Sequence, residues 1–311
     1  MPARSSAMAY ELDISEPLEG EVRRIAREQV ARALAELGGD DAARAVHESR
    51  KRMKRLRSLL RALRPLLGRT YETENVRFRD IARRLAGARD ARVLADTAAA
   101  LTAHAGERAA AVRPVAQAFA ERYRSLVAAG GEDGASDAAA AELDAARTAI
   151  DAWPLGRLDR RALIDGLARV YAAGRRARDH AGNGADAEAN HEWRKHAQRH
   201  WHHMRLVRRL WPEAMAAREA AAKRLVDLLG RDHDLSALAA ALAGTGTKGA
   251  AAMLELLRER QRLIRAEVGF VARRLYAERP AALASRLTAY WRAAEREANG
   301  AGPKARRRSA Q

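Results

Sequence analysis

The sequence has no cysteine, few aromatic residues and no long apolar run, and each absence excludes a class of protein. Without cysteine there can be no disulfide framework, no thiolate nucleophile and no zinc site built on thiolates. No segment approaches the roughly 18 apolar residues that a membrane span needs. The N-terminal stretch MPARSSAMAYELDIS also lacks the apolar region of a secretory signal. We therefore expect a cytoplasmic location and no membrane partner.

The composition predicts an all-α fold. Aromatic residues are only 5% of 311, Ala, Leu and Arg dominate, and no stretch alternates with the period of a strand. Residues 130–141 read as a surface linker, although 137–152 could form a helix. The apolar periodicity and cap signals predict helices over about 16–37, 41–67, 72–85, 90–102, 107–127, 159–181, a long segment from 187 that ends near 211, 213–229, 234–242, 248–276 and 281–298.

Positive charge is the strongest compositional signal. The chain has 58 Lys and Arg against 40 Asp and Glu, which gives a net charge of +18. Residues 47–64 carry +7, residues 191–209 carry +5 and the tail from 299 carries +4, so three segments hold 16 of the 18 charges. Such a surplus attracts a polyanion and opposes folding through self-repulsion.

An internal repeat places the first two of these segments in one register. Shifting the sequence by 144 residues superimposes a His-Glu-x-Arg-Lys motif and also a distant aspartate, so one register extends over 43 residues. The matched pairs are His47 with His191, Arg50 with Arg194, Lys51 with Lys195, Arg55 with Arg199, Arg61 with Arg205, Arg64 with Arg208, and Asp90 with Asp234. A duplication of this kind is more than chance similarity between Ala- and Arg-rich stretches.

Each repeated segment sorts into an apolar and a basic face when it is drawn as a helix. The apolar stripes include Met53 and Leu60 in the first copy, and Trp193 and Trp211 in the second, whereas Ser58 and His202 fall on the basic faces. A solvated helix also carries charge, but it normally mixes signs because like charges four residues apart destabilise a helix. These faces are almost purely positive in both copies, which favours an anionic ligand over simple solvation.

The duplicated motif, followed by Arg89-Asp90 in one half and His233-Asp234 in the other, resembles the CHAD family, the conserved histidine α-helical domains. The likeness covers roughly residues 8–298. It implies two antiparallel four-helix-type bundles related by a pseudo-two-fold axis, residues 8–153 and 154–298, with a disordered basic tail over 299–311. It further implies that a basic groove between the bundles binds inorganic polyphosphate and that the protein associates with polyphosphate granules.

Matching the family motif to this sequence gives the candidate phosphate-binding residues. They are His47, Arg50, Lys51, Lys54, Arg57 and Arg61 in the first half, and His191, Arg194, Lys195, Arg199, His202 and Arg205 in the second. Two departures weaken the second copy, since Gln198 replaces Lys54 and residues 200–203 are unusually rich in histidine. Because histidines that face a polyanion gain protons, we predict tighter binding at pH 6 than at pH 8.

Three alternatives compete with this interpretation. DNA or RNA would be drawn by the same charge, although the basic faces carry almost no aromatic residues for base stacking. His233-Asp234 is the leading candidate for a metal-dependent phosphohydrolase, but an N-cap role for Asp90 and Asp234 is more plausible. His196 and His200 have the spacing of a helical metal site without an accompanying carboxylate. We therefore expect no catalytic residue, no metal and no cofactor.

Overall fold

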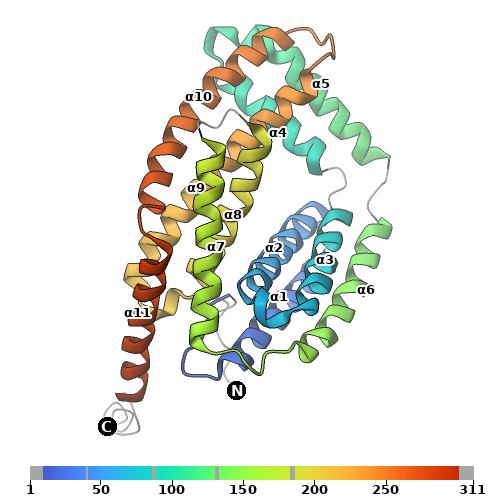
Figure 1. Ribbon diagram of the computed structural model, residues 1–311. Coiled ribbons are helices and arrows are strands. Elements are labelled where there is room, and N and C mark those ends of the chain that lie inside the picture. The colour runs from blue at the N-terminus through green and yellow to red at the C-terminus, as the bar shows by residue number, and fades with distance from the viewer. Residues whose placement is uncertain (1–9, 40, 86–88, 130–132, 183–185, 301–311) are drawn as a thin grey trace, which may run out of the picture.

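The computed structural model describes residues 10–39, 41–85, 89–129, 133–182 and 186–300, and within these ranges it contains eleven α-helices and no strand (Figure 1). The all-α prediction is confirmed. The helices are α1 (Leu18–Leu37), α2 (Ala42–Leu67), α3 (Arg69–Arg84), α4 (Arg89–Ala103), α5 (Ala109–Ala128), α6 (Asp133–Ala149), α7 (Arg160–Ala181), α8 (Ala187–Leu206), α9 (Pro212–Leu242), α10 (Ala250–Leu275) and α11 (Pro280–Gly300). None of the helices in the described ranges is both long and apolar enough to cross a bilayer.

Two segments differ from the sequence-based expectation. Residues 133–141, expected as linker, belong to α6, whose Ala139, Leu143 and Ala146 are fully buried and so supply a packing face. The expected break between 229 and 234 is absent because α9 continues through it. The side chain of Asp232 is held within this stretch by Arg265 and by the Asn190 amide, at 2.8 and 3.2 Å. Tertiary contacts thus keep α9 continuous.

The 144-residue register extends over nearly all the helices. Shifted by 144, α1 becomes 162–181 and coincides with α7, and α2 becomes 186–211, which contains α8 and the following 3-10 turn Arg208–Leu210. In the same way α5 becomes 253–272, within α10, and α6 becomes 277–293, which overlaps α11. The single helix α9 occupies the place of both α3 and α4. The duplication is therefore a property of the helix order as well as of the basic motif.

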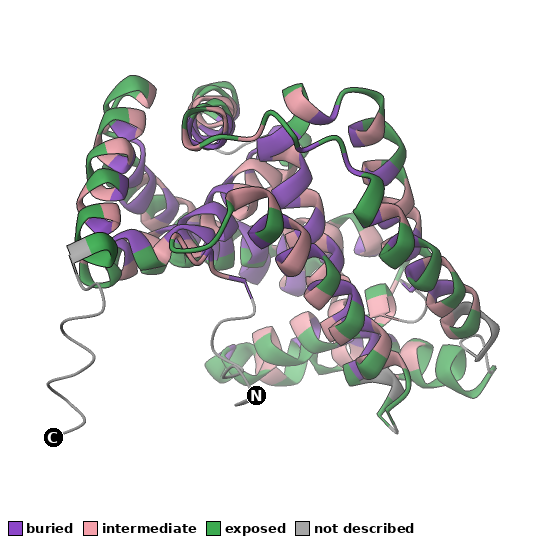
Figure 2. Cartoon of the chain, turned by 90° about the horizontal axis from the view of Figure 1, so that it is seen from below, coloured by how far each residue is buried: buried purple, intermediate pink, exposed green. Residues whose placement is uncertain are grey.

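The two halves pack against each other in two regions. Helices α2 and α7 approach so closely that a Cβ on Gly166 would lie 2.0 Å from the Ala62 carbonyl oxygen. Helices α4 and α5 lie at the end of the molecule opposite both termini and pack on α9 and α10 (Figure 1). One hydrophobic core runs through both halves, and its buried positions face the spaces between helices (Figure 2). The expected division at 153/154 falls just before α7 and stays a prediction.

Of the two tryptophans predicted on the apolar stripe of the second copy, one is buried and the other is not. Trp193 is buried as expected, but Trp211 is 50% exposed and its ring stands edge-on to Tyr290 of α11, because the chain turns there between α8 and α9. Of the expected tail, residues 299 and 300 end α11, and 301–311 lie outside the described residues.

Candidate anion-binding site

The repeated basic helices α2 and α8 cross at one pair of equivalent residues. Ser58 Oγ lies 2.8 Å from His202 Nδ1, and these two residues are 144 positions apart. His203 Nε2 donates to the Ser58 carbonyl oxygen at 2.8 Å. All three side chains are buried. A contact between the same position of two repeats is what a two-fold relation between them requires at its axis.

The crossing removes His202 from the set of phosphate ligands, so that part of the sequence prediction is wrong. Its ring is enclosed by Tyr10, Trp201 and α2, and burial, followed by the nearby Arg55, lowers its pKa well below the ordinary value. Helix angles placed both Ser58 and His202 on the basic faces, but the two faces press against each other at this point. The histidine is therefore a neutral packing residue.

Four cations gather on one side of the crossing, and we call Arg50, Lys54, Arg89 and Arg194 the central cluster. Lys54 is partly buried, and its ammonium forms no hydrogen bond or ion pair with any described residue. Burial, and then the charges of Arg194, Arg89 and Arg50, lower the pKa of Lys54 to about 8. Asp234 of α9 offsets part of this repulsion. The cluster is thus short of negative charge.

The two arginines of the repeated motif reach the central cluster from opposite helices. Arg50 of α2 donates to the carbonyl of Ala82 near the end of α3. Arg194 of α8 lies against Gly230 of α9, where an added Cβ would meet its guanidinium at 3.2 Å. Burial lowers the pKa of both arginines, and Arg89 adds to the effect. Because residue 230 is glycine, the guanidinium of Arg194 can lie against α9, the helix that carries Asp234.

Two further groups of arginines flank the contact of Ser58 with His202, because Arg55 and Arg61 lie about one turn before and after Ser58 on α2. We call Arg57, Arg61 and Arg199 one flanking cluster, and Arg55 and Arg205 the other. Burial, followed by repulsion from Arg61, lowers the pKa of Arg199 to about 10. Burial, together with Arg52 and Arg205, lowers the pKa of Arg55 to about 10. Since Arg55 corresponds to Arg199 and Arg61 to Arg205 in the repeat, the two contacts exchange under the 144-residue shift.

The flanking clusters have incomplete hydrogen bonding. Arg61 donates to the Tyr71 hydroxyl at 2.8 Å and Arg57 to the Asn75 side-chain oxygen at 3.0 Å. In the other flanking cluster, the Nε of Arg205 is buried without a partner in the described part of the chain. Neutral partners leave the positive charge uncompensated, so these side chains retain the capacity to bind an anion.

The part of the chain that forms this crossing matches a known family. The model of the CHAD domain matches residues 24–243, which is 220 of the 311 residues. The chain belongs to the CHAD family. The match runs from α1 to the end of α9 and so contains α2, α8 and all the cations described above. No curated protein matches the chain.

The remaining candidate residues of this CHAD domain lie at the starts of α2 and α8. Lys51 forms an ion pair with Glu48 at 2.7 Å, and Lys195 pairs in the same way with Glu192. His47 is exposed, but the part of its ring that the protein covers, followed by the charge of Lys51, lowers its pKa. His191 stacks on His233 with 4.6 Å between ring centroids, and burial followed by that ring lowers its pKa. The two lysines are therefore neutralised locally, in contrast to Lys54.

Sequence reasoning did not select Arg89 as a ligand, although the structure brings it to the central cluster. The available signal was its match with His233 in the repeat, directly before the repeated aspartate. The N-cap interpretation of that aspartate is wrong for Asp234, which lies inside α9, and Asp90 lies within the first turn of α4. Burial raises the pKa of Asp234, while Arg194 opposes the change. Asp234 is thus a partial counter-ion of the central cluster.

The histidines considered for metal binding are separated by their surroundings. The ring of His200 is buried between Tyr171 and Tyr276, with centroids at 4.9 and 6.2 Å, and burial lowers its pKa to about 3. His196 instead lies beside Arg199, and burial and that charge lower its pKa to about 4. Within the described ranges no three His, Asp, Glu or Cys side chains are grouped as metal ligands.

Proposed function

We propose that this CHAD protein binds inorganic polyphosphate across the crossing of α2 and α8, without catalysing its breakdown, and that this binding brings it to polyphosphate granules. The observation that carries the proposal is the central cluster, in which Lys54 and Arg194 are partly buried beside other cations. Bringing like charges together out of water is unfavourable, and an anion that enters between them removes that cost. The free protein is therefore prepared for a dense row of negative charges.

The arrangement of the three clusters favours a linear polyanion over a single phosphate. Cations occur at the crossing and on both flanks of it, and they come from α2, α4 and α8. A flexible chain with about one charge per phosphate can contact successive guanidinium groups and release counter-ions along its length. Affinity should therefore fall steeply as salt concentration rises.

Nucleic acid is a weaker candidate because the clusters offer little surface for stacking bases. Tyr71 is buried, and its ring and hydroxyl contact Arg64 and Arg61. Tyr10 is also buried, with its hydroxyl donating to the Arg55 carbonyl. Proteins that bind single strands generally present exposed aromatic rings in a basic groove. Charge without such rings supports polyphosphate.

A competition experiment tests the proposal. Long-chain polyphosphate is titrated against double-stranded DNA and single-stranded RNA at physiological salt, and phosphate release is followed with Mg²⁺ or Mn²⁺. We expect preferential polyphosphate binding and no phosphate release. Preference for either nucleic acid, or turnover, would overturn the proposal.

A pair of variants with equal loss of charge locates the site. In the first, Arg50, Lys54 and Arg194 are changed to Gln, and in the control three exposed arginines of α5 and α10 are changed to Gln. The control residues are Arg113, Arg122 and Arg262. The first variant should lose at least about tenfold in affinity and show a shallower salt dependence, whereas the control should change little. Equal effects of the two variants would show that net charge, and not the crossing, determines binding.

A further inference from the structure

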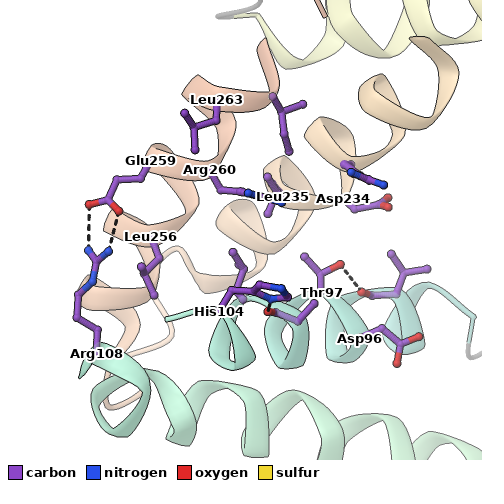
Figure 3. A pocket seen from close by; sticks show the side chains of 15 residues that line it. Asp96, Thr97, His104, Arg108, Asp234, Leu235, Leu256, Glu259, Arg260 and Leu263 are labelled. Atoms are coloured by element: carbon purple, nitrogen blue, oxygen red, sulfur yellow. Dashed lines mark hydrogen bonds and ion pairs between the residues drawn. The ribbon is translucent and has the colours of Figure 1, made fainter. Parts of the chain in front are cut away.

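A cavity lies between α4, α9 and α10, with Asp234 of the anion-binding site in its wall (Figure 3). Its volume is about 560 Å³, which is within the range of small-molecule sites. Leucine side chains from all three helices line it, namely Leu101, Leu235, Leu256 and Leu263. Leu263 is 65% exposed, the largest exposure among the large apolar side chains of the described residues. An apolar wall left open in this way fits an apolar ligand.

The repeat shows that two wall residues of this cavity have buried counterparts in the first half. The positions in α5 that correspond to Glu259 and Leu263 are Val115 and Phe119, and both are buried. In the first half, therefore, these positions are packed into the core. In the second half, a carboxylate and a shorter, exposed leucine replace them. The open wall that α10 presents is therefore not repeated at the equivalent positions of α5, and the cavity combines that wall with α4 of the first half.

The charges around the cavity leave two arginines without a counter-ion. Arg108 and Glu259 form a two-point ion pair at 2.9 and 2.7 Å across the edge of the cavity (Figure 3). Asp96, which also lines the cavity, is paired at 3.6 Å with Arg92, a residue that is not part of the lining. Arg231 and Arg260 line the cavity and form no hydrogen bond or ion pair with any other residue that the structure describes. The lining as a whole carries three arginines and three carboxylates, and Arg231 and Arg260 are the two arginines among them that no described carboxylate pairs with.

We propose that this cavity binds a long-chain carboxylate, with the alkyl chain against the leucines and the carboxylate between Arg231 and Arg260. An aliphatic chain matches the wall, and a carboxylate matches the paired donors of guanidinium groups. A single negative charge suits the site better than a phosphate dianion, because Asp96 and Asp234 also line the cavity and would repel a second charge. The ligand class follows from this balance of surface and charge.

The proposed carboxylate site does not depend on polyphosphate binding, although it adjoins the central cluster. Asp234 lines the cavity and also faces Arg194 of the central cluster. The arginines that would hold the carboxylate belong to neither the central nor the flanking clusters. Binding at one site can therefore be tested in variants that leave the other unchanged.

The test uses dodecanoate on the full chain, below its micelle concentration, with dodecyltrimethylammonium as a probe of equal chain length and opposite charge. Calorimetric titration should give one dodecanoate per chain and no comparable binding of the cation. Changing both Arg231 and Arg260 to Gln should weaken dodecanoate binding by about tenfold or more while polyphosphate binding persists. Equal binding of the two amphiphiles, or no binding of either, would refute the proposal.

A filling variant distinguishes the cavity from adsorption on the surface. Ala100 lines the cavity on α4, whereas its neighbour Ala99 is also exposed and does not line it. Ala100→Trp should abolish dodecanoate binding, and Ala99→Trp should leave it within about twofold of wild type. Circular dichroism and polyphosphate binding check that both variants are folded. Binding that survives in Ala100→Trp would show that the amphiphile lies elsewhere.

Discussion

Lys54 is the residue at which stability and anion binding should oppose each other most clearly. It lies in the middle of α2, partly buried, with Arg50, Arg89 and Arg194 as its charged neighbours. Its pKa of about 8 is below the ordinary value of 10.5 because burial and these charges disfavour the ammonium form. Folding therefore holds a positive charge in a place where it is costly.

The difference in pKa gives the size of this cost. A lowering from 10.5 to about 8 corresponds to roughly 3 kcal/mol against the charged form at neutral pH, which we take as an upper bound. Because the folded pKa is the lower one, the unfolded chain binds more protons between pH 8 and 10.5, and the free energy of unfolding should rise with pH across that window. Below pH 8 the full cost is present.

Lys54→Gln removes the charge and copies the residue at the equivalent position of the second half, Gln198. We expect the ligand-free variant to be more stable than wild type by about 1 to 3 kcal/mol at pH 7, measured by urea unfolding. The rise in stability between pH 8 and 10.5 should disappear. Affinity for polyphosphate should fall by about fivefold to tenfold, since one charge-assisted contact is lost.

Two further variants make this result specific. Lys51→Gln removes the same charge from the same helix, but Lys51 is paired with Glu48, so no stabilisation is expected. Gln198→Lys should do the reverse of Lys54→Gln, lowering stability and tightening polyphosphate binding. A Lys54→Gln protein that is no more stable than wild type, or that binds polyphosphate equally well, would refute the account of the central cluster.

Three other properties can be measured directly. Burial lowers the pKa of His47 and His191 in the free protein, and a polyanion would raise it, so polyphosphate should bind more tightly at pH 6 than at pH 8. Changing both residues to Gln should reduce this difference in affinity. Equal wild-type affinities at the two pH values would contradict the prediction. The pKa of buried His200 is about 3, well below the 6.5 of an unfolded chain, so its contribution to stability is complete above pH 6.5 and is lost as pH falls. Keeping the His200 ring neutral should lower the free energy of unfolding by about 2 kcal/mol at pH 5 relative to neutral pH. His200→Phe has no such cost, so it should lose less stability than wild type between pH 7.5 and pH 5 in urea unfolding. An equal loss in both proteins would show that the ring is already charged in the fold. Gly166→Ala should destabilise the protein by about 1 to 3 kcal/mol or more in thermal unfolding, because the new Cβ meets a carbonyl of α2. Gly20→Ala, with nothing within 4 Å of the new Cβ, should be neutral or slightly stabilising. The same effect in both variants would show that α2 and α7 do not approach so closely.

Sequence periodicity was sufficient for the parts of the molecule that depend on one helix at a time. The all-α class, most helix ranges and the register of the repeat follow from apolar spacing and from the duplicated motif. The family follows from that motif as well, and the CHAD match over 24–243 confirms it. These predictions are correct because the local preference of each segment and the tertiary structure agree.

Properties that depend on two helices could not be read from a helical wheel. A wheel places Ser58 and His202 on basic faces, yet it contains no information on where one basic face meets the other. The distinction between Lys51 and Lys54 also depends on neighbours, since an acid three residues away neutralises the first and Arg194 from another helix repels the second. The continuous α9 similarly depends on contacts of Asp232 with α8 and α10.

The contact between Ser58 and His202 shows what joining two copies in one chain permits. In a symmetric dimer of half-length chains, a residue on the two-fold axis would meet an identical residue, so serine would face serine or histidine would face histidine. A single chain lifts this restriction, and the crossing holds a hydroxyl against an imidazole at 2.8 Å. The same freedom lets Gln198 stand where a second Lys54 would add to the repulsion. Joining the two copies thus allows the crossing to become chemically unequal while Arg50, Arg55 and Arg61 keep their counterparts Arg194, Arg199 and Arg205.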